Sequence, residues 1–193
     1  MTWIGLLGLC VAASGCASFR SGNLAPISTW PPAPTASKRA IVLAVSGRSI
    51  MNGDEEQVDV CDLATWREQA VRAYTDSELF SKVGTEPSRG ALRVEVTVTD
   101  DESHSMLLWW ISGLSAWIIP DYGSNEFTVE TTLKDPNGRV LGQVRKSEKV
   151  NYWEQILMLF ATPFACPSCV IEDTLYDLNR ATLVEAREKK LFD

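Results

Sequence analysis

The sequence is poor in the residues and motifs that several common classes of binding site need. It has one histidine, His104, among 193 residues, and no run of lysine and arginine long enough to build a basic face. The net charge is -7. Contacts to phosphates need clustered positive charge, so we expect no nucleic-acid partner. No glycine-rich phosphate loop is present either. The apolar fraction of 45% predicts a real hydrophobic core in one domain of ordinary size.

The sequence also lacks an apolar run of the roughly 20 residues that a membrane-spanning helix needs. Its first run, Trp3–Val11, is short and leads into the small residues of 12–15 and then Cys16. This order is typical of a secretory signal with its cleavage site. The tetrad Ala13-Ser14-Gly15-Cys16 resembles the lipobox of bacterial lipoproteins.

That resemblance carries implications for processing and location. It implies that residues 1–15 are a removable signal peptide and that Cys16 becomes the acylated, palmitate-bearing first residue. In that family, Asp after the lipidated cysteine is associated with retention at the inner membrane. Here Ala17 and Ser18 follow. The resemblance therefore implies an outer-membrane lipoprotein that faces the periplasm and has membrane lipid as its first partner.

The composition changes after the cysteine. Residues 16–38 are rich in Ser, Ala and Pro, with Pro31 and Pro32 adjacent. This composition predicts a flexible tether, partly extended in polyproline form. We expect a single α/β domain over residues 39–193.

Periodicity gives the expected elements of that domain. Apolar alternation and apolar runs predict strands, and apolar residues at helical spacing predict helices. In chain order these are Ala40–Val45 (strand), Asp62–Phe80 (helix), Leu92–Val98, Phe127–Leu133 and Arg139–Lys149 (strands), and Ile171–Lys190 (helix). The order β-α-β-β-β-α predicts an α+β two-layer sandwich. Its sheet should be rich in antiparallel pairs, with both helices on one face and an apolar insertion between the second and third strands.

Two apolar, aromatic-rich segments lie at residues 106–120 and 152–164. The first precedes the third strand and the second follows the fourth strand, so both are expected at the same end of the sheet. A 15-residue helix covers about 22 Å, less than the hydrocarbon thickness of about 30 Å. We therefore predict interfacial elements that enter one leaflet. The predicted membrane-contact residues are Trp109, Trp110, Trp117, Ile118, Ile119, Trp153 and Phe160.

Two other interpretations of these segments stay open at this point. They could cover the open face of the sheet as part of the core. They could also form a docking surface for an envelope protein, because a large exposed apolar patch marks interfaces of either kind.

The remaining cysteines suggest a disulfide. Cys166-Pro167-Ser168-Cys169 before an amphipathic helix resembles the motif of thioredoxin, which implies thiol exchange. However, the 24 residues after Cys169 leave no room for the further strands of that fold. A structural disulfide is the preferred interpretation. We expect Cys61 to bond with Cys166 or Cys169, and a direct bond between Cys166 and Cys169 is the alternative.

His104 has no ligand-like spacing to the cysteines, so neither a metal site nor a cofactor is predicted. No nucleophile motif accompanies it, and no catalytic residue is assigned. The sequence predicts a non-enzymatic, membrane-anchored lipoprotein, an accessory or assembly component that acts by binding. The alternatives are a periplasmic thiol/disulfide protein using Cys166 and Cys169, and a lipid-handling module.

Overall fold

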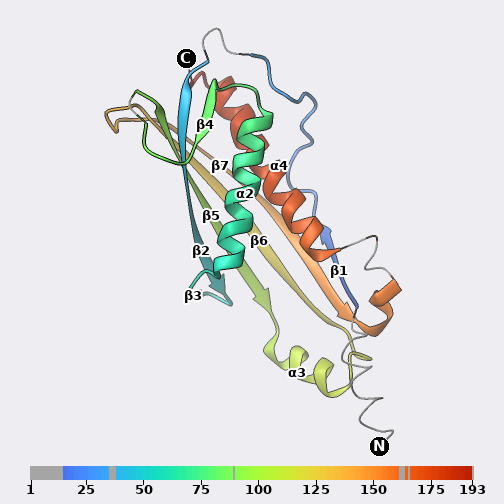
Figure 1. The fold of residues 1–193 in the computed structure, drawn as a ribbon. Coiled ribbons are helices and arrows are strands. Elements are labelled where there is room, and N and C mark those ends of the chain that lie inside the picture. Colours follow the sequence, from blue (N-terminus) through green and yellow to red (C-terminus); the bar gives the residue numbers. More distant parts are fainter. Residues whose placement is uncertain (1–14, 35–37, 89, 161–163, 165, 193) are drawn as a thin grey trace, which may run out of the picture.

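The computed structural model describes residues 15–34, 38–88, 90–160, 164 and 166–192 (Figure 1). The predicted signal peptide, residues 1–15, lies outside the described residues except for Gly15. The elements in chain order are β1 (Gly15–Arg20), β2 (Ala40–Met51), β3 (Asp54–Glu56), α2 (Val60–Asp76), β4 (Lys82–Gly84), β5 (Leu92–His104), α3 (Met106–Leu114), β6 (Asp121–Lys134), β7 (Val140–Gln155), the 3₁₀ helix η1 (Ile156–Phe160) and α4 (Pro167–Glu188).

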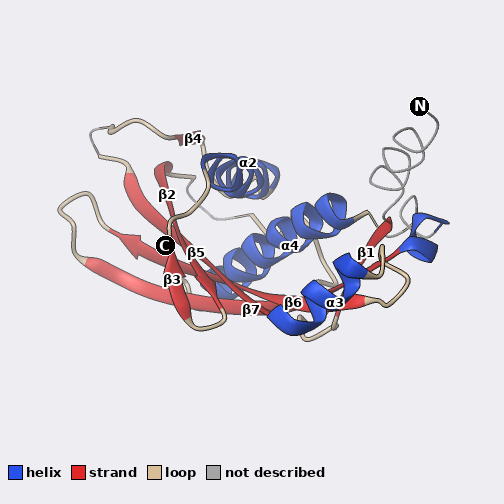
Figure 2. Ribbon diagram, turned by 90° about the horizontal axis from the view of Figure 1, so that it is seen from below, coloured by secondary structure: helices blue, strands red, loops and turns tan. Residues whose placement is uncertain are grey.

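The strands form one mixed sheet in the order β1-β7-β6-β5-β2-β3, and β4 also pairs with β2. The pairs β2–β5 and β2–β4 are parallel, and the other pairs are antiparallel. Helices α2 and α4 pack together on the same face of the sheet (Figures 1 and 2). The predicted α+β sandwich is confirmed, including the apolar insertion between the second and third long strands. Helix α2 connects the parallel pair β2 and β5.

The core lies between this face and the two helices. Alternate residues of β5, from Leu92 to Val98, are buried, and Trp66 and Tyr74 of α2 pack against the same cluster. Gly47 of β2 lies directly under Trp66, and a Cβ there would overlap the indole ring. The absence of a side chain at this strand position therefore permits the close approach of α2 to the sheet.

The strands extend beyond their predicted ends toward one end of the sheet. β5 continues to His104, β6 begins at Asp121, and β7 continues to Gln155. Past Val98 the inward positions of β5 are polar, with Asp100 first in the series. Apolar alternation therefore marks β5 only as far as Val98, because the inward residues beyond it are polar. The backbone pairing of the strand nevertheless continues to His104.

The first residues of the predicted tether form a strand. Gly15–Arg20 forms the edge strand β1, antiparallel to β7, and Ala17 and Ser18 are buried. Downstream, the indole of Trp30 lies under the guanidinium of Arg180 at 4.7 Å. The start of the predicted tether is therefore part of the sheet, and later residues lie against α4. Strand β1 has too few alternating apolar residues to be detected, since its place depends on pairing with β7.

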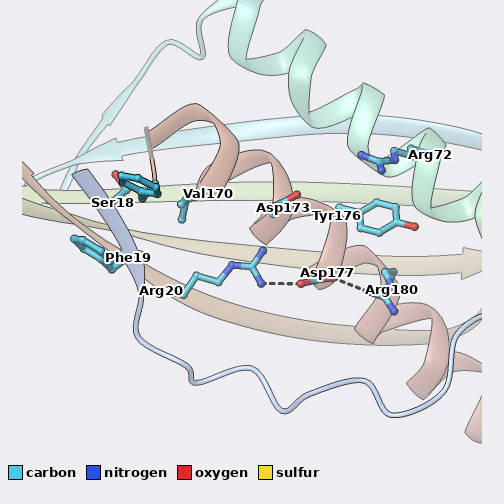
Figure 3. A pocket seen from close by; sticks show the side chains of 10 residues that line it. Ser18, Phe19, Arg20, Arg72, Val170, Asp173, Tyr176, Asp177 and Arg180 are labelled. Atoms are coloured by element: carbon cyan, nitrogen blue, oxygen red, sulfur yellow. Dashed lines mark hydrogen bonds and ion pairs between the residues drawn. The ribbon is translucent and has the colours of Figure 1, made fainter. Parts of the chain in front are cut away.

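The contact between β1 and α4 is fixed by charge. Arg20 Nη1 donates to Asp177 Oδ2 at 2.7 Å, and Asp177 Oδ1 accepts from Arg180 Nη1 at 2.8 Å (Figure 3). These pairs line an open cavity of about 580 Å³. Because Arg20 and Arg180 both pair with Asp177, this side of the cavity is a structural joint between strand and helix.

Candidate functional site

The two apolar segments meet at one end of the sheet, as predicted. His104 at the end of β5 pairs with Gly123, and Tyr122 pairs with Trp153. The two segments also touch, because Ile156 N donates to the carbonyl oxygen of Trp117 at 3.1 Å. We call α3, the loop to Pro120, η1 and the rings of Tyr122 and Trp153 the apolar tip. Figure 1 shows α3 beyond the end of the sheet.

Helix α3 is apolar around most of its circumference. Ser105 caps it by accepting from Leu108 N at 3.4 Å, and only Ser112 is buried. After the helix, Ala116 and Trp117 both have positive φ, and Trp117 N donates to Ser112 O at 2.9 Å. The chain is thereby turned back toward β6. A helix with apolar residues on all sides belongs in a core or in lipid, yet this one projects from the domain.

The apolar tip carries most of the exposed apolar surface of the described chain. Thirteen of the eighteen exposed large apolar side chains among the described residues belong to it. The exposed fractions reach 59% for Trp110, 69% for Ile118 and 78% for Phe160. These segments therefore do not cover the open face of the sheet, and that interpretation is wrong.

All seven predicted membrane-contact residues lie in the tip. Six are exposed and Trp117 is half-buried. The indoles of Trp109 and Trp110 meet edge to face at 5.2 Å, and the rings of Tyr122 and Trp153 lie 5.8 Å apart. Contact of these residues with a membrane stays a prediction.

Cys16 lies at the same end. In the register of β1 and β7, Cys16 pairs with Glu154 and Ala17 pairs with Trp153. Cys16 also lines a cavity of about 260 Å³ together with Trp109 of the tip. The predicted lipidation site is therefore next to the apolar tip, a relation that depends on β1 and could not be derived from the sequence.

This cavity is acidic. Glu102, Asp121 and Glu154 line it, and Tyr152 Oη donates to Glu102 Oε1 at 2.8 Å. Burial, and then the charge of Asp121, raises the pKa of Glu154. Burial, and then Glu154, raises the pKa of the Cys16 thiol. A thiol in such surroundings is a weak nucleophile.

One further carboxyl group lies behind the cavity. Asp100 accepts from Asn125 Nδ2 at 2.9 Å, and burial raises its pKa to about 6. The charges of Glu102, Asp62 and Asp101 act in the same direction, while the hydrogen bond from Asn125 opposes them. Asp100 is the first polar residue on the inward row of β5, directly after buried Val98 in that row.

The disulfide joins Cys166 and Cys169, which was the alternative pairing, and Cys61 is an exposed free thiol. Both helices begin at the tip end of the sheet. However, Cys61 starts α2, which packs on β2, whereas Cys166 starts α4, which packs on β7 and β1. The preferred bond to Cys61 fails because strands β5 and β6 separate the two helix starts.

His104 is held by neighbours of its own sheet. Its backbone N donates to Asn52 Oδ1 at 3.0 Å, and its Nδ1 lies 3.4 Å from Glu102 Oε1. Within the part of the chain that the structure describes, no three His, Cys, Asp or Glu side chains are grouped so that they could hold a metal ion. Over the same residues, every helix is too short or too polar to cross a bilayer.

Comparison with known proteins gives structural neighbours only. No family model matches the sequence, and no curated protein does. A minor lipoprotein from Acinetobacter baumannii matches with a TM-score of 0.45 and 10% identity over 78% of this chain and 90% of that one. Rare lipoprotein B from Shewanella oneidensis matches with a TM-score of 0.42 and 9% identity, covering 79% and 97%. The PelC dodecamer from Paraburkholderia phytofirmans gives 0.37 and 9%, covering 86% and 95%.

These neighbours are bacterial lipoproteins. At such identities and TM-scores the likeness assigns no activity, ligand or partner to this chain.

Proposed function

We propose that this protein is a non-enzymatic envelope lipoprotein, an accessory or assembly component that acts by binding at a membrane surface. The observation that carries the proposal is the position of Cys16. Strand pairing places this lipobox cysteine beside Glu154 and next to the apolar tip. Acyl chains on Cys16 would leave the domain where its exposed apolar side chains are concentrated.

Two attachments at one end support each other physically. A single acyl chain binds a bilayer only marginally, and further chains or an additional apolar contact make anchoring stable. Each large apolar side chain that leaves water contributes about 1.5–3 kcal/mol. Partial insertion of Trp110, Ile118 and Phe160 would therefore add a contribution comparable to that of an acyl chain.

This attachment would orient the whole domain. Cys16 belongs to the sheet, so no flexible linker separates the anchor from the core. The 16 residues of β7 span about 50 Å at about 3.3 Å per residue. The turn at Asp135–Gly138 would then stand about that far from the bilayer.

We further propose an outer-membrane location facing the periplasm. The support is the pair Ala17 and Ser18 after the lipobox cysteine, which differs from the Asp of inner-membrane lipoproteins.

The test combines intact mass with membrane extraction. The protein purified from bacterial membranes should carry acyl mass on Cys16 and resist alkaline extraction. Trp110→Ser with Ile118→Ser should increase the extracted fraction, because both side chains are exposed and their loss leaves the core intact. Val140→Ser is the matched control, since Val140 is 54% exposed but lies at the distal end of β7. Absence of acyl mass on Cys16 would overturn the proposal.

A thiol/disulfide role is a second candidate, favoured by the bond between Cys166 and Cys169 at the start of α4. Replacing both cysteines by serine should abolish disulfide exchange with a model substrate if this role is correct. Unchanged membrane association in that variant would support the binding role. The lipid-handling alternative stays a prediction.

A further inference from the structure

We infer that the apolar tip fits a bilayer surface of zwitterionic lipid and is disfavoured by anionic lipid. The inference rests on the proposed function and adds the class of lipid headgroup that the site accepts. The feature that carries it is the sign of the charge around the tip.

The sequence segments that build the tip contain no positive charge. Residues 94–133 and 150–179 have no lysine or arginine, although they include α3, η1 and the strand ends that hold them. The same segments contain acidic side chains in several places. We call four of these, on the cavity side of the strand ends, the acidic collar: Asp100, Glu102, Asp121 and Glu154.

The register places part of the collar at the depth of the headgroups. Asp121 follows Pro120, the last residue of the tip loop, and Glu154 follows Trp153 directly. Tyr122 and Trp153 are the ring types that favour the membrane–water interface. If these rings lie at headgroup depth, the carboxyl groups of their chain neighbours lie within a Debye length, about 10 Å, of the lipid charges.

The nearest basic residues along the paired strands do not offset the collar. Arg20 is paired with Asp177, and Arg48 is paired with Glu55 at 3.0 Å. Lys149 lies opposite Glu126 in the register of β6 and β7. The end of the domain that would face the bilayer is therefore apolar at its surface, and the strand ends behind that surface carry carboxyl groups without a neighbouring lysine or arginine.

Interfacial segments that bind anionic lipid have the opposite pattern, with lysine and arginine around an apolar face. Each basic residue near an anionic surface strengthens binding about fivefold. An ionised carboxyl group at the same depth weakens it by a similar factor. Charge complementarity therefore favours binding of the tip to a bilayer surface without net negative charge.

The experiment measures tip insertion in a protein that is already anchored by its acyl chains. The full lipidated protein is reconstituted into phosphatidylcholine vesicles or into phosphatidylcholine vesicles that contain phosphatidylglycerol, at low salt. Quenching of tryptophan emission by brominated lipid reports insertion. We expect strong quenching in the zwitterionic vesicles. In the anionic vesicles, the ratio of inserted to withdrawn tip should fall by at least about fivefold.

Two further measurements attribute the difference to the collar. The variant Glu102→Gln, Asp121→Asn, Glu154→Gln should insert equally in both vesicles, whereas Glu86→Gln, an exposed change in the loop after β4, should behave like the wild type. High salt should reduce the difference in the wild type, which tests the charge effect without any substitution.

The outcomes separate the two claims. Equal or stronger quenching in the anionic vesicles overturns the inference and leaves the proposed function standing. No quenching in either vesicle overturns membrane insertion itself, and then an apolar groove with a basic rim on a protein partner is the occupant. Discrimination that high salt leaves unchanged also contradicts the inference, because salt must weaken the interaction of the collar with headgroup charges that lie in water.

Discussion

Replacing Asp100 by asparagine should stabilise the protein at neutral pH and leave it unchanged in acid. Asp100 lies on the inward row of β5 and accepts from Asn125 at 2.9 Å. An asparagine side chain has the same shape and can keep that hydrogen bond through its own amide oxygen. The substitution therefore removes a partly buried negative charge while preserving the local contacts.

The magnitude follows from the pKa. Burial raises the pKa of Asp100 from 3.8 to about 6, a difference of about two units. Each unit corresponds to about 1.36 kcal/mol, so ionisation costs the folded state about 3 kcal/mol. Because the folded pKa is the higher one, the protonated group stabilises the fold fully below about pH 4. That contribution is lost as the pH rises through about 6.

The assay is urea denaturation of the wild type and Asp100→Asn in the same detergent. The free energy of unfolding of the variant should exceed that of the wild type by up to about 3 kcal/mol at neutral pH and by almost nothing near pH 4. Asp101→Asn is the matched control, since Asp101 is exposed on the other face of the same strand. An equal effect of Asp100→Asn at both pH values would refute the reasoning.

Two more substitutions test the packing near the tip and in residues 16–38, the segment predicted to be a tether. Gly123→Ala should lower the free energy of unfolding by about 1–3 kcal/mol, because the added Cβ would overlap the ring of Tyr152. Urea denaturation with no loss would contradict this packing. Glu148→Ala should cost about 2–3 kcal/mol, because buried Glu148 accepts from the backbone N–H groups of Asn23 and Leu24 at 3.2 and 2.7 Å. It should also speed proteolysis near Asn23, and an unchanged cleavage pattern would show that these contacts do not hold the segment.

The parts of the fold that were predictable are those with local signals. Apolar alternation from Leu92 to Val98 identified a strand, and the direction of successive strands placed the two apolar segments at one end. Both results depend on short-range pattern and connectivity, which the sequence contains. The extension of β5 to His104 was missed because its inward residues become polar.

The relation between anchor and tip depends on long-range pairing. Gly15–Arg20 has the composition of a linker, and its strand exists because β7 offers an edge. The bond between Cys166 and Cys169 was correctly named only as an alternative, because the lateral distance between helix starts depends on the strand order. Neither the strand order of the sheet nor the pairing of β1 at its edge leaves a local signal in the sequence of these segments.

The most direct test of the central proposal is the depth of the tip tryptophans in a zwitterionic bilayer. The full lipidated protein is placed in vesicles with bromine near the headgroup or deep in the acyl chain, beside a variant with Trp109→Phe and Trp110→Phe. The proposal predicts strong quenching by the shallow bromine that the variant largely loses. Emission that is quenched by aqueous acrylamide and untouched by either bromine would show that the tip does not enter the membrane.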